Sequence, residues 1–215
     1  LMARGGFHGK ILRVDLGQER VSIETLEDDL ARDYIGGRGL GSAILWHELP
    51  PQTDPLSPDN KLILATGLLN GTGAALSSRY EVVTKSPLTN TILSANSGGR
   101  FPVALKGTGF DAIIIGGMAQ SPSYLWVDDQ EVEIRDASPL WGMNSHQTTD
   151  RLLEETPKAA VACIGPAGET GVLFASVMNE RDRAAGRGGA GCVMGAKKLK
   201  AVVVQGSHET PVADP

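Results

Sequence analysis

Residues 183–201 have the sequence RAAGRGGAGCVMGAKKLKA, in which glycines are followed by a short apolar run and then by lysines. Glycines before a helix let a ligand approach the backbone closely, and the free N–H groups of the first turn attract anions. The pattern predicts a glycine-rich turn and a short helix, with arginines at 79, 183 and 187 available for charge-assisted hydrogen bonds to phosphate or a polar heterocycle. The same glycines would also suit tight turns or close packing, so the segment alone leaves both interpretations open.

A weaker version of this segment, NSGGRFPVALKGTG, occupies residues 96–109, and other patterns also occur twice in the same order. The repeated pairs are alternating hairpins at 10–26 and 124–136, short helices at 26–37 and 145–156, strands with glycine-rich turns at 62–74 and 161–172, and buried strands ending in glycine at 110–117 and 199–206. We infer an internal duplication, about 9–117 and 122–206, with pseudo-two-fold symmetry. Chance recurrence of such elements is the alternative.

Composition argues against several classes of partner and location. The net charge of −5 does not favour nucleic acid or an anionic membrane surface. No apolar run approaches the roughly 18 residues of a membrane span, and the N-terminal LMARGGFHGKI lacks the apolar core of a signal peptide. Cys163 and Cys192 form neither a C-x-x-C motif nor a disulfide framework. We therefore expect a cytoplasmic protein without a metal site built from its own cysteines.

Other candidate motifs favour structural roles. The chain has no G-x-x-x-x-G-K-[ST] phosphate loop, and GGRGLG at 36–41 lacks the preceding strand of a dinucleotide fingerprint. The four histidines are scattered, without metal-ligand spacing. Asp128-Asp129 predicts a hairpin turn, and Cys192 in its apolar, glycine-rich run predicts a packing residue.

Five segments in order carry a resemblance to a known family. They are SSRYEVVTKSPLTNTI (77–92), SANSGGRF (94–101), FDAIIIGG (110–117), IGPAGE (164–169) and the segment 183–201. Together they resemble the N-terminal domain of aldehyde ferredoxin oxidoreductases, the tungsten-pterin family that also includes molybdenum-using relatives. The resemblance runs from about Gly9 to Asp214.

The resemblance implies an α+β fold, a duplicated pseudo-two-fold αββα sandwich with two mixed β-sheets face to face and helices outside. It implies that 9–207 is a bis-pyranopterin-binding N-terminal domain and that 208–215 is a linker to C-terminal domains outside this chain. In the family, two pterins supply the sulfurs that bind one tungsten or molybdenum, and Mg²⁺ bridges the two pterin phosphates. A [4Fe–4S] cluster would be bound by the C-terminal part, because the family's cysteine run is not in this chain.

The resemblance also assigns site residues. Arg79 matches an arginine that contacts a pterin. The loop under one pterin matches Asn96, Ser97 and Gly98, and the loop under the other matches Arg183, Ala184 and Gly186. The backbone carbonyls of Asn96 and Ala184 match ligands of the bridging Mg²⁺, for which oxygen is the suitable donor. The phosphates would also be close to Arg187 and Lys85.

The whole enzyme would oxidise an aldehyde to its carboxylic acid and pass the electrons through the cluster to ferredoxin or a similar acceptor. The catalytic residues would lie outside this chain. Partners would be the electron-transfer protein, the enzyme's own C-terminal domains and, in a homo-oligomer, a second copy. Two alternatives rest on the glycine loops alone: a phosphate- or nucleotide-binding module without redox chemistry, and a structural domain whose glycines serve packing.

Overall fold

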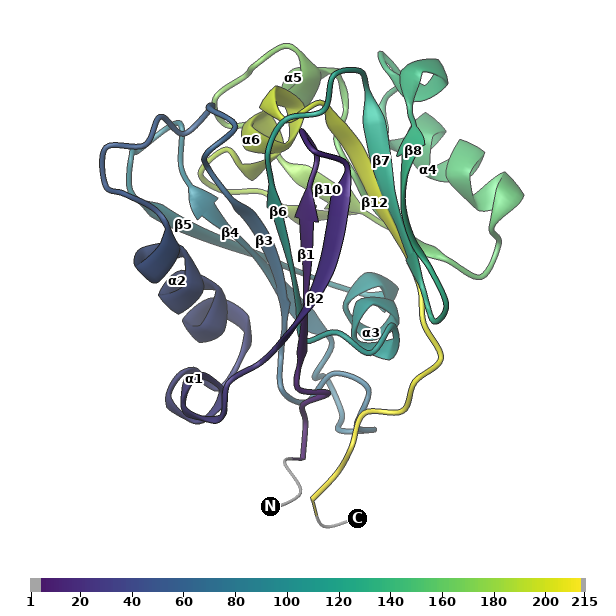
Figure 1. Cartoon of the computed structure of the whole chain (residues 1–215). Helices are drawn as coiled ribbons and strands as arrows, with labels where there is room; N and C mark the ends of the chain where they lie inside the picture. Colours follow the sequence, from purple (N-terminus) through teal and green to yellow (C-terminus); the bar gives the residue numbers. More distant parts are fainter. Residues whose placement is uncertain (1–4, 214–215) are drawn as a thin grey trace.

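The computed structural model describes residues 5–213 and consists of two six-stranded β-sheets with helices around and between them (Figure 1). The first sheet contains β1 (Lys10–Asp15), β2 (Arg20–Thr25), β3 (Leu62–Thr66), β4 (Arg79–Lys85), β5 (Ile92–Gly98) and β6 (Ala112–Gly116). The second contains β7 (Ser123–Asp128), β8 (Val132–Asp136), β9 (Ala160–Cys163), β10 (Val177–Asn179), β11 (Arg183–Ala185) and β12 (Leu199–Gln205).

The two sheets have the same topology. From the hairpin edge, the strand order is β2-β1-β6-β3-β4-β5 in the first sheet and β8-β7-β12-β9-β10-β11 in the second. In each sheet the first hairpin strand pairs in parallel with the last strand of its half, and the other pairings are antiparallel. The two halves therefore repeat one another strand by strand, and the predicted two-sheet α+β sandwich is confirmed.

The hairpins form for the same local reason in both halves. Each ends its first strand with an aspartate, Asp15 or Asp128, whose Oδ1 accepts hydrogen bonds of 2.7–3.0 Å from the N–H groups two and three residues further on. An aspartate in this position replaces the backbone acceptor of a turn. The prediction of a hairpin turn at Asp128-Asp129 is confirmed.

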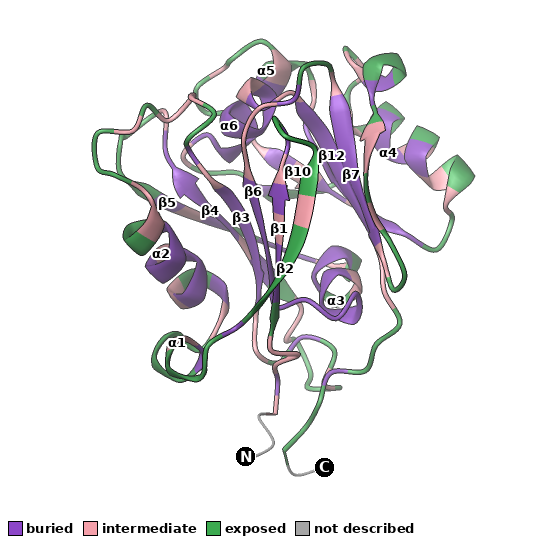
Figure 2. Cartoon of the chain, viewed as in Figure 1, coloured by how far each residue is buried: buried purple, intermediate pink, exposed green. Residues whose placement is uncertain are grey.

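The main helices lie either on the outer face of a sheet or between the two sheets. They are α1 (Asp28–Tyr34), α2 (Gly37–Glu48), α3 (Arg100–Gly107), the 3₁₀ turn η1 (Ser138–Leu140), α4 (Ser145–Glu155), α5 (Pro166–Glu169) and α6 (Ala190–Ala196). An apolar cluster packs α2 on the outer face of the first sheet, and another packs α4 on the outer face of the second, where the predicted fold places helices. The helices α3 and α6 differ, because each contributes to the core between the sheets and contacts strands of the opposite half. The core appears as the buried layers in Figure 2.

Glycine permits the close approach of both internal helices. Gly99 precedes α3 with φ 101°, and a Cβ there would lie 2.3 Å from Glu180 Oε2. Gly189 precedes α6 with φ 86°, and a Cβ there would lie 1.9 Å from the carbonyl oxygen of Leu173. A positive φ and these contacts both require glycine. In these positions the glycines serve packing, as one of the sequence interpretations allows.

The helix α2 was not predicted from the sequence, because its first turns carry the glycines of GGRGLG. Glycine weakens an isolated helix, but Gly41 lets this helix lie directly on β4. A Cβ on Gly41 would approach Val83 Cγ2 to 2.8 Å. Tertiary packing therefore outweighs local propensity in this segment.

The chain segment after β12 lies along the domain. Gly107 accepts a hydrogen bond from the His208 amide at 2.8 Å, and Asn70 accepts one from the Thr210 hydroxyl at 2.8 Å. The Gly6 amide donates to the carbonyl of Pro211 at 2.6 Å. The predicted linker, 208–215, is therefore docked as far as its described residues extend, and residues 214 and 215 lie outside them. Among helices of the described part of the chain, none has the length and apolar character that crossing a bilayer requires.

Lys197, at the end of α6, is almost completely buried and connects the two halves. Its Nζ donates to the carbonyls of Pro58 at 3.2 Å and Gly117 at 2.9 Å. Besides ending α6, this lysine therefore holds the second half of the domain to the first. Burial lowers the pKa of Lys197 to about 8, and the charge of Lys61 adds to this effect.

We predict that stability depends on pH through Lys197. Its pKa is about 8 in the fold and 10.5 in the unfolded chain, so the unfolded state binds more protons between these values. The free energy of unfolding contributed by Lys197 therefore rises with pH across this window, by about 1–3 kcal/mol. Urea unfolding of the chain and of Lys197→Met from pH 7 to 10.5 should show the difference, wild type minus variant, rising. A constant difference would contradict the burial of this ammonium group.

Candidate functional site

The two glycine-containing segments come together where the sheets meet at their edges. The edge strands β5 and β11 each have one hydrogen-bonded neighbour, and they lie side by side. The resemblance implied loops at Asn96, Ser97 and Gly98 and at Arg183, Ala184 and Gly186. Only Gly186 lies in a loop, since the other residues belong to β5 and β11. An edge strand still presents the feature expected of the loops, because its outer backbone N–H and C=O groups are free of ladder hydrogen bonds.

A cleft of about 530 Å³ lies across this junction. It is lined by residues of α2, of β5, and of β11 with the loop after it: Arg38, Ser94, Ala95, Asn96, Ala184, Gly186 and Arg187. The cleft is therefore built from both halves of the duplication. Its walls combine backbone, a small amide and two guanidinium groups.

The structure brings four of the residues singled out from the sequence to this cleft. Asn96 and Ala184, the predicted Mg²⁺ ligands, line it from opposite halves, together with Gly186 and Arg187. Arg79 lies beside it, and its Nη1 donates to Asn96 Oδ1 at 3.2 Å. Site residues that the family resemblance assigned far apart in the sequence thus lie close together in the fold.

Other predicted residues support the cleft from behind. Ser97 is 2% exposed and does not line the cleft. Gly98 is also buried, and its carbonyl oxygen accepts a 2.8 Å hydrogen bond from Nδ2 of Asn179. For these residues the structure leaves at most a backbone role toward a ligand.

Arg183 is exposed, with its Nε 3.7 Å from Glu180 Oε2. The same glutamate accepts a 2.7 Å hydrogen bond from the amide of Phe101, in the first turn of α3. A carboxylate at a helix N-terminus interacts favourably with the helix dipole. Glu180 therefore ties the second half to α3 of the first half while holding Arg183 nearby.

Lys85, predicted to help bind the phosphates, is elsewhere. Its Nζ donates to the carbonyl of Thr53 at 2.8 Å and to that of Pro51, and the side chain borders a different cavity beside Trp46. The buried ammonium group of Lys85 is thus part of a loop anchor and does not reach the cleft.

Sequence reasoning missed three side chains that shape this region. Arg38 lines the cleft, Glu81 lies next to it on β4, and Asn179 joins the two halves beneath it. Arg38 lies in GGRGLG, and the only binding motif that this segment resembles is a dinucleotide fingerprint, which it does not complete. For Glu81 and Asn179 no local signal exists, because their contacts link residues far apart in the sequence.

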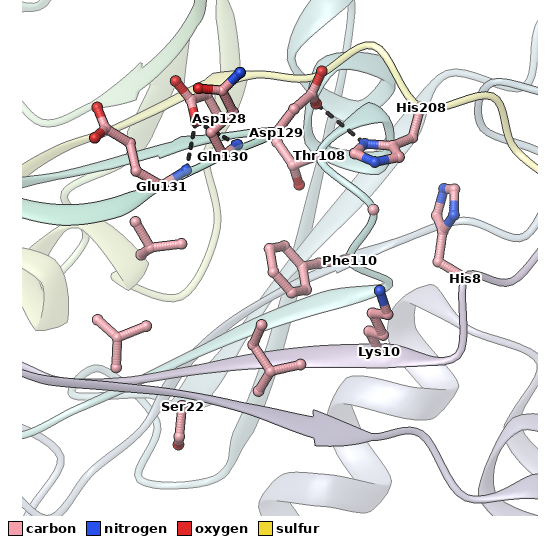
Figure 3. Close-up of a pocket in the computed structure, with 14 residues that line it drawn as sticks. His8, Lys10, Ser22, Thr108, Phe110, Asp128, Asp129, Gln130, Glu131 and His208 are labelled. Carbon is pink, nitrogen blue, oxygen red and sulfur yellow. Dashed lines mark hydrogen bonds and ion pairs between the residues drawn. The ribbon is translucent and has the colours of Figure 1, made fainter.

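A slightly larger cavity of about 580 Å³ lies between the hairpins β1–β2 and β7–β8 (Figure 3). His8 and His208 meet at one end of it, with ring centroids 6.4 Å apart, although no sequence motif pairs them. His208 Nδ1 lies 3.1 Å from Asp129 Oδ1. Within residues 5–213 no group of three or more histidine, cysteine, aspartate or glutamate side chains is arranged to hold a metal ion. The cleft between β5 and β11 is the stronger candidate site, because four residues singled out from the sequence line it from both halves.

A family model described as the N-terminal domain of aldehyde ferredoxin oxidoreductase matches residues 11–206. The chain belongs to this family. It is 48% identical to the tungsten-containing aldehyde ferredoxin oxidoreductase of Pyrococcus furiosus and 52% identical to that of Pyrococcus abyssi, in each case over 97% of this chain and 35% of the relative. The chain thus spans about a third of the length of these curated relatives.

Family members with other names share the domain. An aliphatic sulfonate oxidoreductase WOR-like subunit of Pyrococcus furiosus is 40% identical over 95% of this chain and 35% of its own length. The active-site complex BamBC of benzoyl coenzyme A reductase, solved with 1,5-dienoyl-CoA, contains a chain that superposes with a TM-score of 0.94 and 41% identity, over 96% of this chain and 32% of that one. The sandwich is therefore a common module of this family.

We predict that Asn179 stabilises the junction beneath the cleft. Asn179→Ala leaves the buried carbonyl of Gly98 without its donor and removes the 3.4 Å contact between Asn179 Oδ1 and the buried Tyr80 hydroxyl. An unsatisfied buried acceptor costs about 1–3 kcal/mol, so urea unfolding of the chain should show a loss of that size. The matched control is the exposed Asn96→Ala, which should change the free energy of unfolding by less than about 0.5 kcal/mol. Equal effects would contradict the structural role of Asn179.

Proposed function

We propose that this domain holds the metallopterin of a tungsten-containing oxidoreductase, in the cleft between β5 and β11. The observation that carries the proposal is the meeting of Asn96 and Ala184, from the two halves of a duplication, on one cleft. A cofactor with two similar pterin arms suits a site built twice. The tungsten named in the Pyrococcus relatives supports this assignment, and molybdenum would bind through the same pterin sulfurs.

The residues present fit such a group. Arg38, Arg79 and Arg187 concentrate positive charge at the cleft, and the nearby carboxylate of Glu81 offsets only part of it. This charge suits phosphates and polar pterin edges. The carbonyls of Asn96 and Ala184 are the donors we assign to Mg²⁺ between the phosphates. Gly186 lines the cleft, so a side chain there would occupy space that we assign to the ligand.

The complete enzyme, in this proposal, converts an aldehyde and water to a carboxylic acid, two protons and two electrons. When bound, the tungsten centre supplies the two-electron chemistry of this conversion. The residues of this chain bind and orient the cofactor, and a [4Fe–4S] cluster outside this chain passes the electrons to ferredoxin or a similar acceptor. We place the enzyme in the cytoplasm, with its own C-terminal domains as neighbours and with room for a homo-oligomer.

Substrate choice lies outside this domain in the proposal. Relatives named for aldehydes, for aliphatic sulfonates and for benzoyl coenzyme A all contain a similar domain. A module shared across such different substrates suits the common cofactor. The alternative of a phosphate- or nucleotide-binding module without redox chemistry has weaker support, because it explains the arginines but not the family.

We predict that Gly186→Val in the full-length enzyme abolishes tungsten and pterin retention without unfolding the domain. A Cβ on Gly186 has no neighbour closer than 3.6 Å, so the fold accepts it, whereas the valine methyls occupy ligand space. Tungsten by mass spectrometry and pterin fluorescence after denaturation measure the loss. Gly116→Val is the matched control, since its added Cβ has no neighbour within 4 Å and Gly116 does not line the cleft. A Gly186→Val enzyme with full tungsten content would refute the assignment of the cleft.

Replacing Arg187 should weaken retention of the cofactor by a smaller, measurable amount. Arg187→Ala removes one charge-assisted interaction, worth about 1.5–3 kcal/mol, and should speed tungsten loss by about ten- to a hundredfold. Arg181→Ala is the control, because Arg181 is also exposed but pairs with Asp150 away from the cleft. Equal loss rates for the two variants would mean that Arg187 does not face the cofactor.

A further inference from the structure

Arg38 lies on the wall of the cleft that α2 contributes and has spare donors. Its side chain is 64% exposed, and its Nη2 lies 3.8 Å from Glu81 Oε1. A guanidinium group carries five N–H donors in a planar fork. A single contact at that distance leaves most of them available to a ligand in the cleft.

Glu81 is held firmly behind Arg38. It lies on β4 opposite Asn96 of β5, and its side chain is only 14% exposed. Its Oε2 accepts a 2.5 Å hydrogen bond from the Ser94 hydroxyl, which leaves Oε1 directed to Arg38. A carboxylate fixed in this way restricts the Arg38 side chain before a ligand binds. Less rotamer entropy is then lost when the ligand binds.

The duplication contains a related arrangement in the other half. Glu180 follows β10, the strand equivalent to β4, and its carboxylate lies 3.7 Å from Arg183. Each half thus places a glutamate beside an arginine at the β5–β11 junction. Arg183 was assigned from the family resemblance, whereas Arg38 was not assigned at all.

Resting on the proposed function, we propose that Arg38 binds a phosphate of the pterin cofactor and that Glu81, supported by Ser94, is its positioning residue. Arg38 lines the same cleft as Asn96 and Ala184, the carbonyl donors we assign to the phosphate-bridging Mg²⁺. Arg187 approaches from the second half, so the two guanidinium groups border one cleft from different halves. Paired arginines are suited to phosphate because each can form two parallel hydrogen bonds.

The test is a double-mutant cycle on tungsten loss from the full-length holoenzyme, with Arg38→Ala, Glu81→Gln and the double variant. We expect Arg38→Ala to speed loss by about ten- to a hundredfold, the scale of a charge-assisted hydrogen bond. Glu81→Gln should speed loss less, and should add nothing in the Arg38→Ala background, because it acts through Arg38. Arg38→Lys, which keeps charge but not the fork, should fall between wild type and Arg38→Ala.

The controls separate this proposal from the proposed function. Arg32→Ala removes an exposed arginine on α1 that pairs with Asp29 and Asp33, and should leave the rate of loss unchanged. Wild-type enzyme without tungsten or pterin would overturn the proposed function and, with it, the role of Arg38. Wild type with full tungsten and an Arg38→Ala rate equal to that of Arg32→Ala would overturn the Arg38 assignment alone. Additive effects of Arg38→Ala and Glu81→Gln would overturn the positioning role of Glu81.

Discussion

The hydrogen bond from the Asn179 amide to the carbonyl of Gly98 fixes the relation between the two halves of this domain. It is buried, it links residues 81 positions apart, and it lies where β5 meets the end of β10. Glu180 adds a second link through the first turn of α3. Because both contacts lie where the edge strands approach one another, we infer that the cleft above them depends on this junction as well as on the shared core.

The duplication explains why the site lies at this edge. Each half ends its sheet in an edge strand, β5 or β11, and the hairpins form the opposite edges. Two sheets joined at one edge give a cleft with equivalent backbone on either side. A ligand with two similar arms can then be held by similar contacts, although the side chains of the halves have diverged: Asn96 stands on one side and Ala184 on the other.

The sequence predicted much of the fold, because its signals are local. Alternating residues predicted both hairpins, Asp128-Asp129 predicted the turn of the second, and the repeated order of elements indicated the duplication. The loop that the resemblance implied at Asn96 is an edge strand in the structure. The helix α2 was missed because packing of Gly41 on β4 stabilises a segment of low helix propensity. Most of the family-derived residues do gather around the cleft. Arg38, Glu81 and Asn179 were missed because their contacts exist only after the chain folds, and Lys85 was misplaced for the same reason.

We propose that one cofactor is held jointly by β5 and β11. Amide hydrogen exchange of the full-length enzyme, compared with and without bound tungsten cofactor, tests this claim most directly. We predict slower exchange in the cofactor-loaded enzyme in two peptides, one covering 92–99 and one covering 183–189, with no change in the hairpin peptide 124–136 of the opposite edge. Protection of only one of the two peptides, or of the hairpin cavity in their place, would contradict the account.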